Sequence, residues 1–284
     1  MKKIAIEINE KLFIAYVGLT ASGYDLADKK DPELQKLTSQ IRSAKIQNEV
    51  IEYFSATKTS QYSVNPYWPR GSCISSACFF INGKDEYNTF SDYLAFEKSI
   101  GADTEEDNDD FRNWIIRLPI FLKEIKNSES YPILRSEYQK ILASRKKEYT
   151  AELRIVDKCV AKFNSNSINN SHIVFVPNLL QAYSIADFVL KDNIIFVIAT
   201  HPDTITLLHE YLHPIVNKYK NILKNFVNKA DFNVFADMRK MSSYGYMRED
   251  SIEAKIHTLE ECAVRAMSII LSNDAHVKKQ QYCK

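Results

Sequence analysis

The sequence has no excess of charge of either sign, since 37 lysine and arginine residues stand against 36 aspartate and glutamate residues. A basic field over the whole molecule, of the kind that attracts nucleic acid or an anionic membrane surface, is therefore not expected. The chain also has few cysteines. The five present are scattered and odd in number, which is typical of reduced thiols in an intracellular protein rather than of a disulfide framework.

Long apolar runs are lacking as well. No stretch approaches about 18 uninterrupted apolar residues, so a membrane span is not predicted. Near the N-terminus, Glu7, Glu10 and Lys11 interrupt the apolar run that a secretory leader requires. We therefore expect a cytoplasmic location, unless a leader has been removed from the chain.

Apolar material for a core is plentiful, because 45% of the 284 residues are hydrophobic. The first half of the chain carries mostly helical periodicity. A capping residue, Asp31, followed by Pro32 opens a predicted long helix that extends to Phe54. Further helices are predicted over 111–125 with a kink at Pro119, over 129–145 and over 149–163.

The pattern changes after 163–171, FNSNSINNS, which has the composition of a linker. HIVFVP and FVLKDNIIFVIA are β-branched and aromatic, so they predict strands, the second pair forming a hairpin that turns at Lys191-Asp192-Asn193. We therefore predict an α+β fold that is predominantly helical with a small β-sheet. Its predicted divisions are a mainly helical N-terminal region, 1–165, and a second region, 166–284.

A predicted helix follows the hairpin, entered through Pro202 and Asp203, and it contains the motif H-E-x-x-H. His209 and His213 are four residues apart, so on a helix they project from one face and can share a cation. With 6 histidines in the chain, such a motif arises by chance in roughly one chain in a hundred. The motif therefore predicts a metal site, and the imidazole pair favours Zn²⁺.

Two histidine ligands leave positions for a third protein ligand and a water molecule. The metal lowers the pKa of that water, and the adjacent Glu210 can accept its proton as it attacks a carbonyl. Pro214 disfavours helical geometry at His213, so the helix is predicted to end or kink there. The alternative interpretation is a pair of satisfied core histidines with Glu210 in a salt bridge.

The third ligand is sought in a second strong helix, EDSIEAKIHTLEECAVRAMSIIL, which Asp250 is predicted to cap. At about 100° per residue, Glu260 falls at the edge of the apolar stripe, whereas Glu261 lies nearly opposite, beside Arg265. Periodicity alone mildly favours Glu260. The predicted stripe consists of Ile252, Ile256, Leu259, Ala263, Ala266 and Ile270.

HEYLH followed later by a helical glutamate resembles the gluzincin arrangement of zinc metallopeptidases. More narrowly, HEYLHPIVN with EECAVRA resembles an uncharacterised family of predicted bacterial metallopeptidases, in which a glutamate three residues before Val-Arg-Ala binds the metal. The resemblance covers 200–271. It implies a zincin-like catalytic region, a peptide or protein substrate, and Glu261 as the third ligand. This chain departs from the commonest gluzincin pattern in having Arg265 where an aspartate is usual.

Three other residues are candidates for supporting roles. Arg265, one turn beyond Glu261, could orient that carboxylate or bind a substrate carboxylate. Tyr244 and Tyr246 are candidates to donate to a developing oxyanion, as a tyrosine or histidine does in the enzymes that the chain resembles. The hypothesis is peptide-bond hydrolysis. The alternatives are another metal-assisted hydrolysis, or a non-catalytic helical binding protein with a structural histidine pair.

Overall fold

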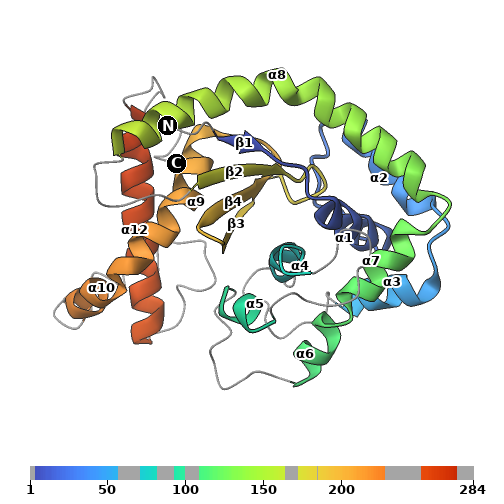
Figure 1. Ribbon diagram of the computed structural model, residues 1–284, viewed down its shortest axis with the longest axis horizontal. Coiled ribbons are helices and arrows are strands. Elements are labelled where there is room, and N and C mark those ends of the chain that lie inside the picture. Colours follow the sequence, from blue (N-terminus) through green and yellow to red (C-terminus); the bar gives the residue numbers. More distant parts are fainter. Residues whose placement is uncertain are drawn as a thin grey trace. The chain divides into compact units, whose positions relative to one another are not determined.

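The computed structural model describes residues 4–56, 71–81, 93–99, 109–163, 172–183, 185–227 and 251–273 (Figure 1). The described part of the chain is mostly helical, with one small mixed sheet of four strands. This confirms the predicted α+β class with a predominance of helix. None of the helices in the described part combines the length and the apolarity needed to cross a bilayer.

The helices are spread over the whole described chain. Their bounds are α1 Glu10–Ala21, α2 Pro32–Ser43, α3 Asn48–Ser55, α4 Gly71–Ala77, α5 Tyr93–Ser99, α6 Asp109–Ile115, α7 Leu118–Lys126, α8 Tyr131–Phe163, α9 Thr204–Val216, α10 Lys220–Val227 and α12 Ile252–Asn273, with a 3₁₀ turn, η2, at Asn217–Tyr219.

The predicted single helix from Asp31 to Phe54 is wrong. Asp31 does cap α2, accepting hydrogen bonds from the backbone N–H groups of Glu33 and Leu34, but that helix ends at Ser43 because Ala44 is extended. The break allows α2 and α3 to pack separately on α1. Tertiary packing thus overrides the continued periodicity of the sequence.

Two other helix predictions also need correction. The predicted kinked helix over 111–125 is two helices, α6 and α7, and Pro119 stands in the first turn of α7, where its missing N–H costs nothing. The helices predicted over 129–145 and 149–163 are one continuous helix, α8. Between them the sequence has no glycine or proline, so nothing in the backbone interrupts the helix.

The sheet has the order β1-β2-β4-β3, with strands β1 Ala5–Ile6, β2 His172–Pro177, β3 Ala186–Lys191 and β4 Ile194–Ala199. β1 pairs in parallel with β2, and this short N-terminal strand was not predicted. The predicted hairpin is confirmed, since β3 and β4 are antiparallel with Lys191 opposite Ile194. Asp192 and Asn193 form its turn with φ values of 52° and 59°, which their residue types tolerate.

The described chain forms two compact units, each discontinuous in sequence. The sheet unit comprises Ala5–Tyr149 and Val174–His201, and the α9–α12 unit comprises Met1–Ile4, Thr150–Ile173 and Pro202–Lys284. The hairpin groups with the N-terminal helices, and β3 packs against α4. The predicted division into 1–165 and 166–284 stays a prediction.

The core of the sheet unit includes α1, which is buried from Leu12 to Thr20. A Cβ atom on Gly18 would lie 2.3 Å from Cε2 of Phe54 on α3. We therefore expect Gly18→Ala to lower the free energy of unfolding by about 1–3 kcal/mol through overpacking, in spite of the better helix propensity of alanine. Urea denaturation of the two proteins measures the change.

The companion variant is Phe54→Leu, which removes atoms from the point of contact. If the clash is the cause, the two substitutions together lower the free energy of unfolding by at least about 0.5 kcal/mol less than the sum of their separate effects. Additive effects of the two substitutions would contradict this explanation.

Candidate metal site

The first element of the site is α9, which follows β4 after a short connection. Asp203 caps this helix by accepting a hydrogen bond from the backbone N–H of Thr206 at 2.9 Å. This confirms the predicted entry through Pro202 and Asp203. Apolar residues, among them Leu208 and Leu212, are fully buried on α9, so the helix is fixed by packing and holds its polar residues in place.

Pro214 does not end the helix at His213, contrary to that part of the sequence expectation. α9 continues to Val216, and the backbone N–H of Asn217 donates to the carbonyl of His213. η2 and α10 follow without interruption. His209 and His213 therefore both lie on helical backbone, one turn apart.

The second element is α12, which packs beside α9 (Figure 1). The predicted cap, Asp250, lies outside the described residues. Ser251 accepts from the backbone N–H of Ala254 at 3.1 Å and so caps the first turn. Figure 1 shows α12 in red alongside the orange α9.

The buried face of α12 matches the predicted apolar stripe only in part. Ile256 of that stripe is buried, but Ile252 and Ile270 are 42% and 67% exposed, whereas Glu260 and Glu261 are each only 7% exposed. The other buried polar residues of this helix are Lys255, Thr258, Ser268 and Ser272. A helix face that buries two carboxylates requires partners for them, and α9 supplies these partners.

The two histidines meet Glu261 at their Nε2 atoms. The Nε2 atoms of His209 and His213 are 3.1 Å apart. One oxygen of Glu261 lies 3.3 Å from Nε2 of His213, and the other lies 3.6 Å from Nε2 of His209. Two imidazole nitrogens and one carboxylate thus converge on one point.

Glu260 approaches His213 from the other side of the ring. Its Oε1 atom is 3.2 Å from Nδ1 of His213, and its Oε2 atom is 3.8 Å from Nδ1 of His257. The two adjacent glutamates of α12 therefore contact different nitrogens of the same imidazole. Glu261, rather than Glu260, faces the point where the two Nε2 atoms meet.

The pKa values of His209 and Glu260 are both lowered, but by different causes. Burial, together with the nearby charges of His213 and Arg265, lowers the pKa of His209 to about 4, so this ring is neutral at pH 7 and has a lone pair for a metal. Burial by itself raises the pKa of Glu260, but hydrogen bonds with His213 and His257 and their charges outweigh it and lower that pKa to about 2. Glu260 is therefore an anion at neutral pH.

Of the remaining predicted residues, two lie in the described part of the chain and two lie outside it. Glu210 is half-buried, and a carboxylate oxygen of it lies within 4.8 Å of ligand atoms of both His209 and His213. Nε of Arg265, whose side chain is 43% exposed, lies 3.5 Å from Glu261. Tyr244 and Tyr246 lie outside the described residues.

The donor set fits zinc. Two imidazole nitrogens and a carboxylate are the protein ligands of a common class of catalytic zinc site, which leaves the fourth position for water. The three groups come from two mutually packed helices and are largely buried, as a metal ligand set held in fixed geometry requires.

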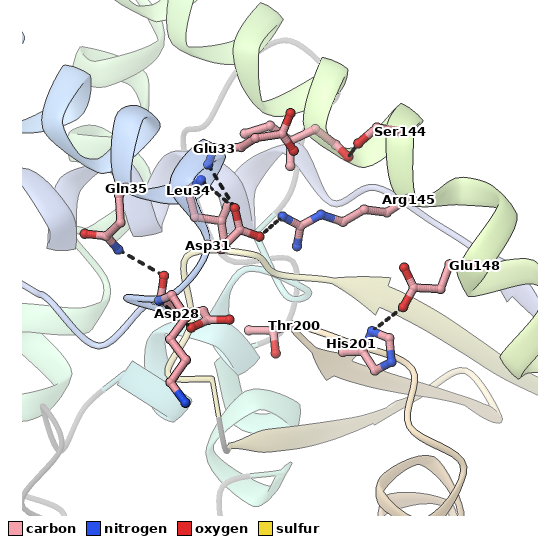
Figure 2. A network of polar contacts seen from close by, with 12 residues as sticks. Asp28, Asp31, Glu33, Leu34, Gln35, Ser144, Arg145, Glu148, Thr200 and His201 are labelled. Atoms are coloured by element: carbon pink, nitrogen blue, oxygen red, sulfur yellow. Dashed lines mark hydrogen bonds and ion pairs between the residues drawn. The ribbon is translucent and has the colours of Figure 1, made fainter.

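A separate polar cluster lies in the sheet unit, beside a cavity of about 590 Å³ (Figure 2). Arg145 of α8 pairs with Asp31, the residue that caps α2, and Nδ1 of His201 lies 3.5 Å from Glu148. These pairings tie α8 to the start of α2 and to the end of β4. His201 thus has an ion-pair partner of its own and is not among the three groups that converge in the α9–α12 unit.

Comparison of the chain with protein-family models, with curated proteins and with solved structures gives no match. The resemblance to metallopeptidases is therefore carried by the motifs HEYLH and EECAVRA alone. Function has to be inferred from the side chains of this chain.

Proposed function

We propose that the protein is a zinc-dependent metallopeptidase that hydrolyses peptide bonds in peptides or proteins. The observation that supports this most directly is the convergence of His209, His213 and Glu261, with Glu210 beside them. Spacing along one helix brings the histidines together, but the glutamate comes from a different helix. A triad assembled from two helices by buried contacts is typical of a ligand set.

The residues have distinct roles in the proposed reaction. His209, His213 and Glu261 hold the metal, and zinc, when bound, supplies Lewis-acid polarisation of the scissile carbonyl and lowers the pKa of a water molecule toward about 7. Glu210 accepts the proton of the attacking water and passes it to the leaving amine, so no net proton is gained or lost by the protein.

Arg265 acts on the ligand rather than on the substrate in this proposal. Its Nε atom is 3.5 Å from an oxygen of Glu261, which holds that carboxylate in orientation. Tyr244 and Tyr246 stay predicted oxyanion contacts.

Metal content tests the ligand set. After exhaustive dialysis, the native protein is expected to retain one zinc ion per chain by elemental analysis. Glu261→Ala is expected to lose it, because one of three protein ligands is removed. Glu253→Ala is the matched control, since Glu253 is exposed on the same helix and should leave zinc content unchanged. Retention of zinc by Glu261→Ala would exclude Glu261 as a ligand.

Substrate assays then test the chemistry. The zinc-loaded protein is expected to cleave bonds in a mixed peptide library and to lose this activity after chelation. Cleavage of esters without cleavage of any peptide would favour another metal-assisted hydrolysis. A native protein without zinc would favour the non-catalytic binding protein with a structural histidine pair.

A further inference from the structure

Glu260 contacts His213 at Nδ1, whereas the other ring nitrogen, Nε2, is the atom that would bind a metal. Its Oε1 atom lies 3.2 Å from Nδ1 of His213, and the side chains of both residues are 9% exposed. A neutral imidazole that binds a metal through Nε2 carries its proton on Nδ1, and this N–H then needs an acceptor. Oε1 of Glu260 lies where that acceptor is required.

A proton on Nδ1 determines what the other nitrogen can do. A neutral imidazole carries one N–H and one lone pair, so a ring protonated at Nδ1 has its lone pair at Nε2. Nε2 of His213 is the atom that lies 3.1 Å from Nε2 of His209 and 3.3 Å from Glu261. The carboxylate of Glu260 thus selects the tautomer in which the lone pair points at the candidate metal position.

The carboxylate is itself anchored. While Oε1 faces His213, Oε2 lies 3.8 Å from Nδ1 of His257, which is one turn earlier on the same helix. A carboxylate with a partner at each oxygen is held in rotation as well as in position. His257 is partly exposed, so this anchor lies toward solvent, and the contact with His213 lies inside.

We propose that Glu260 is a positioning residue, which fixes the tautomer and the ring orientation of His213 so that Nε2 is reserved for the metal. This inference rests on the proposed function. It also gives the adjacent glutamates of α12 separate tasks: Glu261 binds the metal directly, and Glu260 acts through His213.

The test is zinc affinity in Glu260→Gln, measured by competition with a chromophoric chelator. Glutamine keeps the size of the side chain and removes the charge, so a packing role predicts an unchanged affinity. The positioning role predicts a zinc dissociation constant raised about 10-fold to 100-fold, the usual cost of losing an outer partner of a histidine ligand. Glu253→Gln is the control, because it removes the same charge from an exposed position on the same helix.

A second measurement uses the native protein and does not depend on the folding of a variant. A proton on Nδ1 of His213, held by Glu260, is expected as a slowly exchanging, ¹⁵N-coupled resonance in the spectrum of the zinc-loaded protein. Absence of that resonance, or a zinc affinity in folded Glu260→Gln within twofold of native, would overturn the inference.

These outcomes are distinguishable from a failure of the proposed function. Native protein that binds no zinc overturns the function and the positioning role together. Native protein that binds zinc but cleaves no peptide overturns the peptidase proposal alone, because the role of Glu260 is measured as affinity.

Discussion

Glu210→Gln is expected to lower kcat/KM for peptide hydrolysis by about 10²-fold to 10⁴-fold, the usual contribution of a general base or acid, while one zinc ion per chain stays bound. The physical reason is that an amide cannot accept the proton of the attacking water. The carboxylate of Glu210 lies within 4.8 Å of ligand atoms of both histidines, close enough to reach a water molecule held among them. Steady-state kinetics on a cleaved peptide, with elemental analysis of the same sample, measures both quantities.

Two results would contradict the assignment of Glu210. Unchanged kcat/KM would exclude it as the base. Loss of zinc along with activity would make Glu210 a metal ligand, a role that its distance to the two histidines also allows. Glu253→Gln provides the matched control for the loss of one carboxylate from the same unit.

His213→Ala is expected to abolish zinc binding, with an affinity loss well beyond the roughly 10-fold to 100-fold that an outer partner costs. His213 has contacts at both ring nitrogens, since its Nε2 atom meets His209 and Glu261 and its Nδ1 atom meets Glu260. Its removal takes away a ligand and leaves two buried carboxylates without a shared partner. Peptide hydrolysis should disappear with the metal.

The control for this variant is His201→Ala. His201 also belongs to the short region around the start of α9, but it is paired with Glu148 in the sheet unit (Figure 2). Its removal is expected to leave zinc content unchanged. Zinc that survives His213→Ala at full stoichiometry would place the metal elsewhere and would overturn the ligand set.

Local patterns predicted the elements that local interactions decide. The hairpin could be located because Asp192 and Asn193 tolerate positive φ and because β-branched runs flank them. The start of α9 could be located because Asp203 is an efficient cap. β1 could not, because a two-residue strand has no periodicity of its own and exists only through its pairing with β2.

The buried face of α12 could be predicted only in part from hydrophobicity. Ile252 and Ile270 at the two ends of the predicted apolar stripe are exposed and Ile256 is buried, whereas Glu260 and Glu261, which lie off the stripe or at its edge, are both buried. Hydrophobic periodicity assumes that a helix turns its apolar residues inward. At a site where carboxylates meet histidines, the buried partners are polar, so the assumption fails there.

The sequence by itself determined that His209 and His213 share one face of a helix and that Glu210 accompanies them, because a spacing of four residues has that result on any helix. It left Glu260 and Glu261 open, since periodicity favoured the first and the motif resemblance favoured the second. Only the tertiary structure placed them, with Glu261 at the two Nε2 atoms and Glu260 at Nδ1 of His213. The reason is that the packing of α12 against α9 decides which of two neighbouring side chains, about 100° apart on the helix, faces each nitrogen.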